Sequence, residues 1–325
     1  MNMKKILYIL TALPLFSSCL LEYPETTADG EKGVDPTSVT LRTNITADFR
    51  MEEDEVDFSH ATIDYRHRIT VAAYLDRQLV AKQTIYEDLS ANGIVRTNVN
   101  LDLHAREYQI VVWADLAGDV DTQPYYNLGD LTSIIYSGSY RGLTVYKDAI
   151  CASETIDLTA YKDEWGAKAS IDMELSRPMG KYEIVATDVE KFIASHTPSK
   201  DNLYEVRLNY NGYIPAGYNA LDGITRNSFN YMTYSKSISG ISATAKEFSM
   251  AFDYVFMDGE EATVPVTIEV RDQKQKIVAK SNIDIRLRRN ARTVVKGNFL
   301  STMPGDGISI DTEFDKKDDV DLGVI

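Results

Sequence analysis

The stretch NVNLDLHAREYQIVVWADL, residues 98–116, decides the fold class of this 325-residue chain. Apolar and polar side chains alternate from Val99 to Leu103, and they alternate again, with the opposite parity, from Tyr108 to Val112. A period of two residues is the pattern of a β-strand that buries one of its faces. Because a change of parity within one strand would turn its apolar face outward, the change at residues 104–107 indicates a turn or a bulge that joins two strands.

Alternating runs of this kind recur along most of the chain. They cover residues 68–75, 169–175, 181–187, 247–256, 263–271, 281–289 and 291–300. One clear helical pattern occurs at residues 187–196, where Thr187 and Glu190 have the spacing of a capping box and Val189 and Phe192 share a face. The sequence therefore predicts an all-β protein of two tandem Greek-key β-sandwich domains with one short connecting helix. Because the break TPSKDN follows that helix, the domains are expected at residues 37–198 and 199–325, the second ending in an acidic tail.

The N-terminus predicts export. Residues 1–18 contain a positive start, an apolar run too short to cross a bilayer and two small residues before Cys19. This layout is similar to a bacterial lipoprotein signal, in which cleavage before Cys19 leaves that cysteine acylated. An ordinary secretory signal with an incidental cysteine is the alternative. The polar residues 19–36, with several glycines and prolines, read as a flexible tether.

The charge of the chain excludes several partners. A formal net charge of −15 repels nucleic acid and bare anionic membranes, so no nucleic-acid partner is expected. Besides Cys19, the only cysteine is Cys151, so an acylated Cys19 leaves no internal disulfide. Cys151 itself, with no histidine close in sequence, reads as a structural thiol.

The sequence shows no recognisable chemistry. The four histidines have no metal-binding spacing, and there is no phosphate-binding glycine loop, no nucleophile elbow and no CxxC motif. The acidic runs at residues 119–121 and 311–321 lack the glycine and terminal glutamate of a calcium loop. We therefore expect no catalytic residues, no metal and no cofactor.

A tyrosine-rich stretch, NYNGYIPAGYNALDG at residues 209–223, is the candidate contact surface. Tyr210, Tyr213 and Tyr218 stand there among glycine and asparagine, a composition that suits a partner-facing loop. A hydrophobic flap folded over the second sheet is the equal alternative.

Several pieces of the chain carry a family resemblance. The most specific are MELSRPMGKYEIVATDV at residues 173–189 and ARTVVKGNFL at 291–300, with LFSSC at 15–19, GVDPTSVTL at 33–41 and YQIVVWADL at 108–116. The chain resembles the fimbrillin superfamily of Bacteroidales bacteria, most of all its lipoprotein anchor and accessory subunits. The resemblance implies two transthyretin-like β-sandwich domains and a role in fimbria assembly at the outer membrane.

The resemblance also implies a fate for the first strand. In polymerising members an arginine-specific protease removes that strand and a neighbour's strand fills the vacated groove, whereas anchor members keep their lipid and are not cut. Here the first strand would be residues 38–45, with Val39 and Leu41 facing inward. The candidate cleavage sites are Arg50, just after the strand, and Arg42, within it. Neither lies in an obvious linker, which favours a retained anchor.

A donor strand would come from the C-terminal part of the chain. Its alternating runs supply the candidates Ile308, Ile310, Val320, Leu322 and Val324. An ordinary last strand followed by a tail is at least as consistent with these runs.

The resulting prediction is a structural protein and not an enzyme. It would be a lipid-anchored protein of the outer membrane and cell surface, acting as a fimbrial anchor or accessory subunit. It would assemble with other fimbrial subunits by β-strand addition, with a host or bacterial surface receptor as a further candidate partner. Two alternatives stay open: a polymerising fimbrillin activated by arginine-specific cleavage, and a surface glycan-binding lipoprotein.

Overall fold

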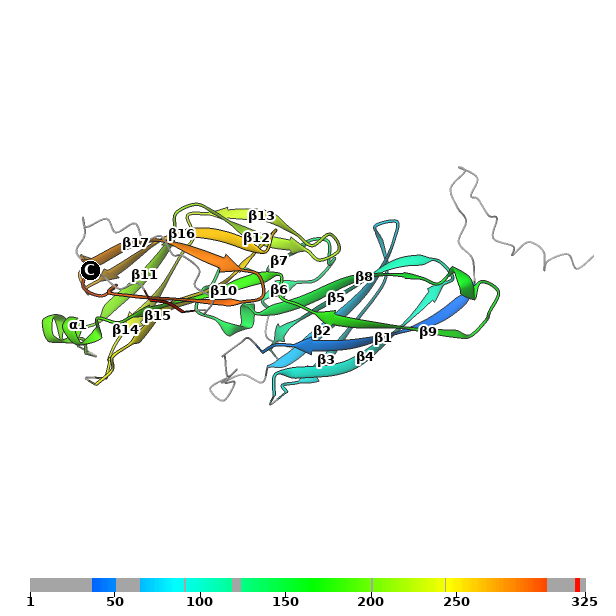
Figure 1. Cartoon of the computed structure of the whole chain (residues 1–325), viewed down its shortest axis with the longest axis horizontal. Coiled ribbons are helices and arrows are strands. Elements are labelled where there is room, and N and C mark those ends of the chain that lie inside the picture. Colours follow the sequence, from blue (N-terminus) through cyan, green and yellow to red (C-terminus); the bar gives the residue numbers. More distant parts are fainter. Residues whose placement is uncertain are drawn as a thin grey trace, which may run out of the picture.

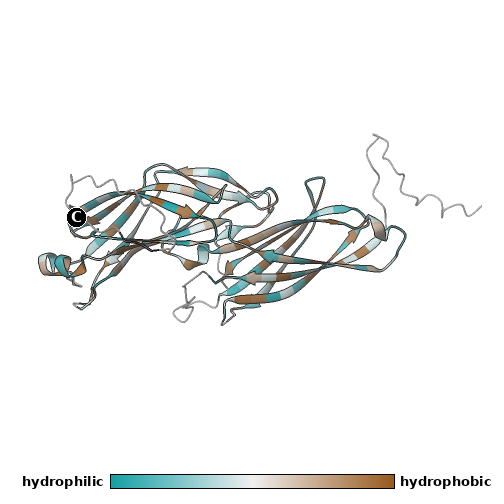
Figure 2. Ribbon diagram, viewed as in Figure 1, coloured by the Kyte–Doolittle hydropathy of each residue, from teal (hydrophilic) through white to brown (hydrophobic). Residues whose placement is uncertain are grey.

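The computed structural model describes residues 37–50, 65–90, 92–118, 124–199, 201–242, 244–302 and 319–321. These residues form two β-sandwiches that lie end to end along the long axis of the molecule (Figure 1). Apolar and polar residues alternate along many of the strands (Figure 2). The prediction of an all-β fold with tandem β-sandwich domains is confirmed.

The N-terminal sandwich consists of two sheets. The first has the strand order β4-β1-β9, built from β1 (Ser38–Asp48), β4 (Ile94–His104) and β9 (Ala167–Leu175). The second has the order β3-β2-β5-β8, built from β2 (Arg66–Leu75), β3 (Gln78–Asp88), β5 (Glu107–Ala117) and β8 (Ala149–Asp157).

The opening stretch of the sequence lies at the centre of this sandwich. β4 and β5 are separated by Ala105 and Arg106, which confirms the predicted turn between two strands. In β5, however, burial does not follow the alternation of the sequence, because residues on both faces of the strand are buried. Val112 faces the core between the two N-terminal sheets, while Val111 and Trp113 on the opposite face are also fully buried, against the C-terminal half. β5 is therefore covered on both of its faces, which explains its nearly continuous apolar run, whereas β3 at the edge of the same sheet has no buried residue.

The C-terminal half contains three sheets. One has the order β15-β10-β18-β19, from β10 (Met179–Ala186), β15 (Phe248–Phe256), β18 (Arg292–Gly297) and β19 (Asp319–Asp321). The second has the order β14-β11-β16-β17, from β11 (Tyr204–Tyr210), β14 (Thr233–Ile238), β16 (Glu261–Arg271) and β17 (Ile277–Arg288). The third has the order β13-β12-β7-β6, from β6 (Tyr126–Asn127), β7 (Ile134–Tyr136), β12 (Tyr213–Asn219) and β13 (Ile224–Asn230).

Two segments cross between the halves. The chain between β5 and β8 contributes β7, which pairs with β12 of the C-terminal half. β10 pairs with β15 and β18, so the change of sheet falls at residues 176–178, earlier than the expected boundary at residues 198 and 199. The reason is that β10 already begins at Met179, within the stretch RPMG, so the chain enters the C-terminal sheets before it reaches the helix. We refer to the region where these segments meet as the domain junction.

The single α-helix of the described residues, α1 (Val189–His196), connects β10 to β11. Val189 and Phe192 are buried, as their spacing predicted. The predicted capping box is wrong, because the N-cap is Asp188 and it makes no side-chain capping bond. Its carboxylate accepts instead from the backbone N–H groups of Leu300 and Ser301. No helix within the described ranges is long and apolar enough to cross a membrane.

Candidate functional site

β1 fills the space between β4 and β9, which we call the β1 groove. It pairs antiparallel with β4 over its whole length and parallel with β9 from Val39 to Ala47. Val39 and Leu41 are fully buried on the inward face. The strand runs three residues beyond the expected end at Ile45, and the inward series continues through Ala47 to Phe49. Both edges of the first strand thus pair with strands of this same chain.

A buried arginine holds the end of β1. The Phe49 ring is buried, and its centroid lies 4.5 Å from the centroid of the His67 ring. The Phe49 N–H donates to the carbonyl of Gly93 at 2.9 Å. Arg177 Nη2 donates to the carbonyl oxygen of Phe49, and Nη1 donates to that of Arg50 at 3.0 Å. The backbone that follows β1 is therefore fixed by side-chain donors as well as by the sheet.

Asp148 completes this arrangement, which we call the Arg177 clamp. Arg177 Nε and Nη2 reach the two carboxylate oxygens of Asp148, each at 2.8 Å, a bidentate pair. Burial acts to lower the pKa of Arg177, but the adjacent Asp148 carboxylate outweighs it and the pKa is raised above its usual value. The guanidinium is therefore charged at every relevant pH. Because Arg177 stands between β9 and β10, the clamp ties the end of β1 to the domain junction.

The two candidate cleavage sites lie in different surroundings. The Arg42 side chain is exposed, but its backbone lies in the middle of β1, opposite Asn100 on β4 and Ser170 on β9. The Arg50 side chain is 56% exposed and pairs with Asp48 at 2.6 Å, a hydrogen-bonded contact that lowers the pKa of Asp48. The Arg50 carbonyl, which belongs to the bond that such a protease would cut, is bound to Arg177.

The C-terminal candidates are mostly outside the described residues. This holds for Ile308, Ile310, Leu322 and Val324, as it does for Cys19. Val320 lies in β19, which pairs parallel with β18 of its own chain, opposite Val295.

The tyrosine-rich stretch forms two strands and not a loop surface. Tyr210 ends β11 and Tyr218 lies in β12, and both side chains are buried, so the hypothesis that they face a partner is wrong for these two residues. Tyr213 is different, since it is 75% exposed at the start of β12. Tyr231, 81% exposed and not singled out from the sequence, follows residue Asn230, which pairs with Tyr213.

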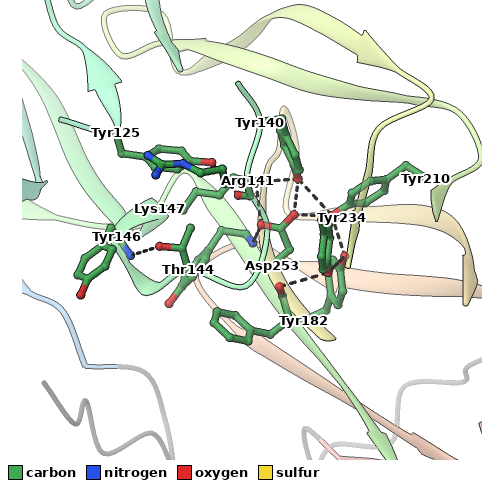
Figure 3. A network of polar contacts seen from close by, with 12 residues as sticks. Tyr125, Tyr140, Arg141, Thr144, Tyr146, Lys147, Tyr182, Tyr210, Tyr234 and Asp253 are labelled. Atoms are coloured by element: carbon green, nitrogen blue, oxygen red, sulfur yellow. Dashed lines mark hydrogen bonds and ion pairs between the residues drawn. The ribbon is translucent and has the colours of Figure 1, made fainter. Parts of the chain in front are cut away.

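A buried polar cluster occupies the domain junction (Figure 3). This junction network consists of Tyr140, Lys147, Tyr182, Tyr210, Tyr234 and Asp253. Lys147 ends a 3-10 turn just before β8, and its Nζ lies 2.8 Å from Asp253 Oδ1 on β15. The two side chains are 1% and 0% exposed. Burial lowers the pKa of Lys147 against the attraction of Asp253.

The tyrosine hydroxyls of the network are organised around the carboxylate. Tyr140 and Tyr210 both donate to Asp253 Oδ2, the latter at 2.7 Å. Tyr210 also contacts the Tyr182 hydroxyl at 2.7 Å, and Tyr182 contacts that of Tyr234 at 3.0 Å. Sequence reasoning missed this network, although an aspartate within the apolar run FSMAFDYVF was a visible signal.

Outside the junction network, few titratable groups of the described residues suggest metal binding or catalysis. Within the described ranges no group of three or more His, Cys, Asp or Glu side chains is placed to hold a metal ion. Burial raises the pKa of the Cys151 thiol to about 12, which leaves it protonated and unreactive. The described residues thus define a two-domain all-β protein whose buried polar groups join its halves.

A comparison with protein families places the chain. The model of a family described as "Family of unknown function (DUF6562)" matches residues 36–323, and the chain belongs to that family. No curated protein matches it in sequence.

Solved structures give distant likenesses. The fimbrial anchor protein Mfa2 from Porphyromonas gingivalis is 14% identical, with a TM-score of 0.39 over 75% of this chain and 81% of that one. A fimbrial assembly protein from Parabacteroides distasonis is 10% identical, with a TM-score of 0.36 over 80% of this chain and 90% of that one.

Proposed function

We propose that this chain is a structural subunit of a surface fibre that keeps its own first strand. It would be exported as a lipoprotein, held at the outer membrane through Cys19, and joined to other fimbrial subunits by β-strand addition. The sequence resemblance supports the fimbrial role. The observation that carries the retained first strand is the position of β1, paired on both sides and clamped at its end by Arg177.

The clamp opposes cleavage at Arg50. A protease binds its substrate as an extended segment with free backbone groups, so paired backbone must first open locally. At Arg50 that opening would break the hydrogen bond from Arg177 to the carbonyl of the bond to be cut. At Arg42 it would break ladder bonds to both neighbouring strands. This geometry favours a retained anchor or accessory subunit over a fimbrillin that cleavage activates.

A partner contact is proposed at Tyr213 and Tyr231. Exposed tyrosines supply large contact area at little entropic cost, and these two lie at the same end of one sheet. The glycan-binding alternative loses support, because two of the three tyrosines on which it rested lie in the core.

Replacing the lipidation site tests the proposed anchor role. In cells that produce the fibre, Cys19→Ser should release fibres into the medium, since acyl chains hold a protein to a bilayer by about 0.8 kcal/mol per buried methylene. Cys151→Ser is the matched control and should leave the fibres on the cells. Fibre counts by electron microscopy and fibre protein in the medium give the readout. Unchanged cell-bound fibres in Cys19→Ser would contradict the role.

A further inference from the structure

The Lys147–Asp253 pair has an unusual setting for an ion pair. Both side chains are buried, and the amine lies over the Tyr140 ring, with Nζ 4.1 Å from the ring centroid. Removing two opposite charges from water costs several kcal/mol per ion, which only excellent geometry offsets. A reaction that removed both charges would relieve that cost.

The contacts around Asp253 are divided between its two oxygens. Tyr140 and Tyr210 donate to Oδ2, whereas Lys147 Nζ donates to Oδ1 at 2.8 Å. Two hydroxyl donors on one oxygen form the arrangement that stabilises negative charge when a nucleophile adds to a carboxyl carbon. Tyr140 also accepts from Lys147 Nζ at 2.8 Å, so its hydroxyl touches both the nucleophile and the carboxylate.

We propose that Lys147 and Asp253 condense into an intramolecular amide bond that crosslinks the two halves of the protein. The lysine ammonium passes one proton to Oδ1, and the neutral Nζ attacks Cγ. The tetrahedral intermediate carries its negative charge on Oδ2, facing the hydroxyls of Tyr140 and Tyr210. A second proton from nitrogen then joins Oδ1, the Cγ–Oδ1 bond breaks, and water leaves. Nitrogen keeps one proton, so atoms and charges balance without any co-reactant.

The surroundings favour each requirement of this step. Burial lowers the pKa of Lys147, which increases the fraction of neutral amine. Fixed contact between the reacting groups replaces a bimolecular encounter, an advantage equivalent to effective concentrations of about 10⁵ M or more. The buried site also excludes the water that would reverse the reaction.

The bond would tie together distant parts of the chain. Lys147 and Asp253 are 106 residues apart, and they belong to the segment before β8 and to β15. The crosslink would therefore span the domain junction, where a pulling force along the long axis of the molecule would act.

Mass spectrometry of the purified full chain tests this proposal directly. We expect an intact mass lower by one water molecule than the sequence requires, and a branched tryptic peptide that contains Lys147 and Asp253. Lys147→Arg should restore the unmodified mass, whereas Lys296→Arg, in the exposed pair with Glu247, should not. Tyr210→Phe should slow formation about 100-fold, by loss of one donor to Oδ2.

The opposite result is equally clear. A natively folded chain, verified by a cooperative melt, that shows the full unmodified mass and two separate tryptic peptides after prolonged incubation would overturn the proposal. Because the proposed fimbrial role does not depend on this bond, either outcome leaves that role to its own test.

Discussion

Replacement of Arg177 by methionine is the sharpest test of the clamp. The change removes the guanidinium but keeps an unbranched side chain, so it leaves the Asp148 carboxylate and the carbonyls of Phe49 and Arg50 without their donor. Breaking a buried ion pair by removing one partner costs about 3–5 kcal/mol. We expect the melting temperature to fall by roughly 10 °C, the scale of that loss for domains of this size.

Proteolysis at Arg50 separates the clamp from general stability. If local opening of the β1 end becomes easier by about 3 kcal/mol, an arginine-specific protease should cut after Arg50 about 100-fold faster. The double variant Arg177→Met, Asp148→Asn should recover part of the loss, because it removes both charges of the pair. Arg66→Met, which removes an exposed pair with Asp88 and an exposed hydrogen bond to the Tyr86 carbonyl, should change stability by less than about 1 kcal/mol. A lower melting temperature with no faster cleavage at Arg50 would refute the view that Arg177 protects this bond.

Three further predictions concern other parts of the molecule. Gly217→Ala should destabilise the chain by at least about 1 kcal/mol in chemical denaturation, because the added Cβ would lie 2.4 Å from the Ile134 carbonyl oxygen. Gly212→Ala is the control and should be neutral, because a Cβ at that position meets nothing within 4 Å. Burial lowers the pKa of His67 to about 4, below its ordinary 6.5, so between these pH values the unfolded chain binds more protons than the folded one. The free energy of unfolding should therefore fall as the pH drops from 6.5 to 4, and His67→Gln should flatten that part of the stability curve. An unchanged slope in this variant would refute the view that His67 causes the fall. Tyr213→Ala should leave the melting temperature unchanged but weaken capture of partner subunits, and equal capture would exclude this contact.

Periodicity was sufficient for the fold because most strands bury one face only. It predicted the turn between β4 and β5, while the inward positions of Val39 and Leu41 came from the family resemblance. Periodicity could not show that β5, which carries Val111 and Trp113, is covered on both of its faces, since that depends on which segment packs against the second face. The capping box failed for a similar reason, because Asp188 binds backbone groups more than 100 residues away.

The polar groups at the domain junction were beyond local sequence reasoning. The partners of Arg177, which include Asp148 and Phe49, are 29 and 128 residues away in sequence, so no local pattern identifies them. Lys147 and Asp253 are charged residues within apolar surroundings, which indicates a buried pair but does not identify the partner. Tyr210 and Tyr218 were ambiguous because tyrosine suits both a core and a contact surface, and burial alone decides between them.

The central claim is that the first strand stays in its own sheet, and N-terminal analysis of the protein from native outer membranes tests it most directly. Mass spectrometry should find a blocked, acylated Cys19 continuous with β1. A free N-terminus at Thr43 or Met51 would contradict the claim, because it would show that the first strand is cut and that the β1 groove is open to a strand from a neighbour.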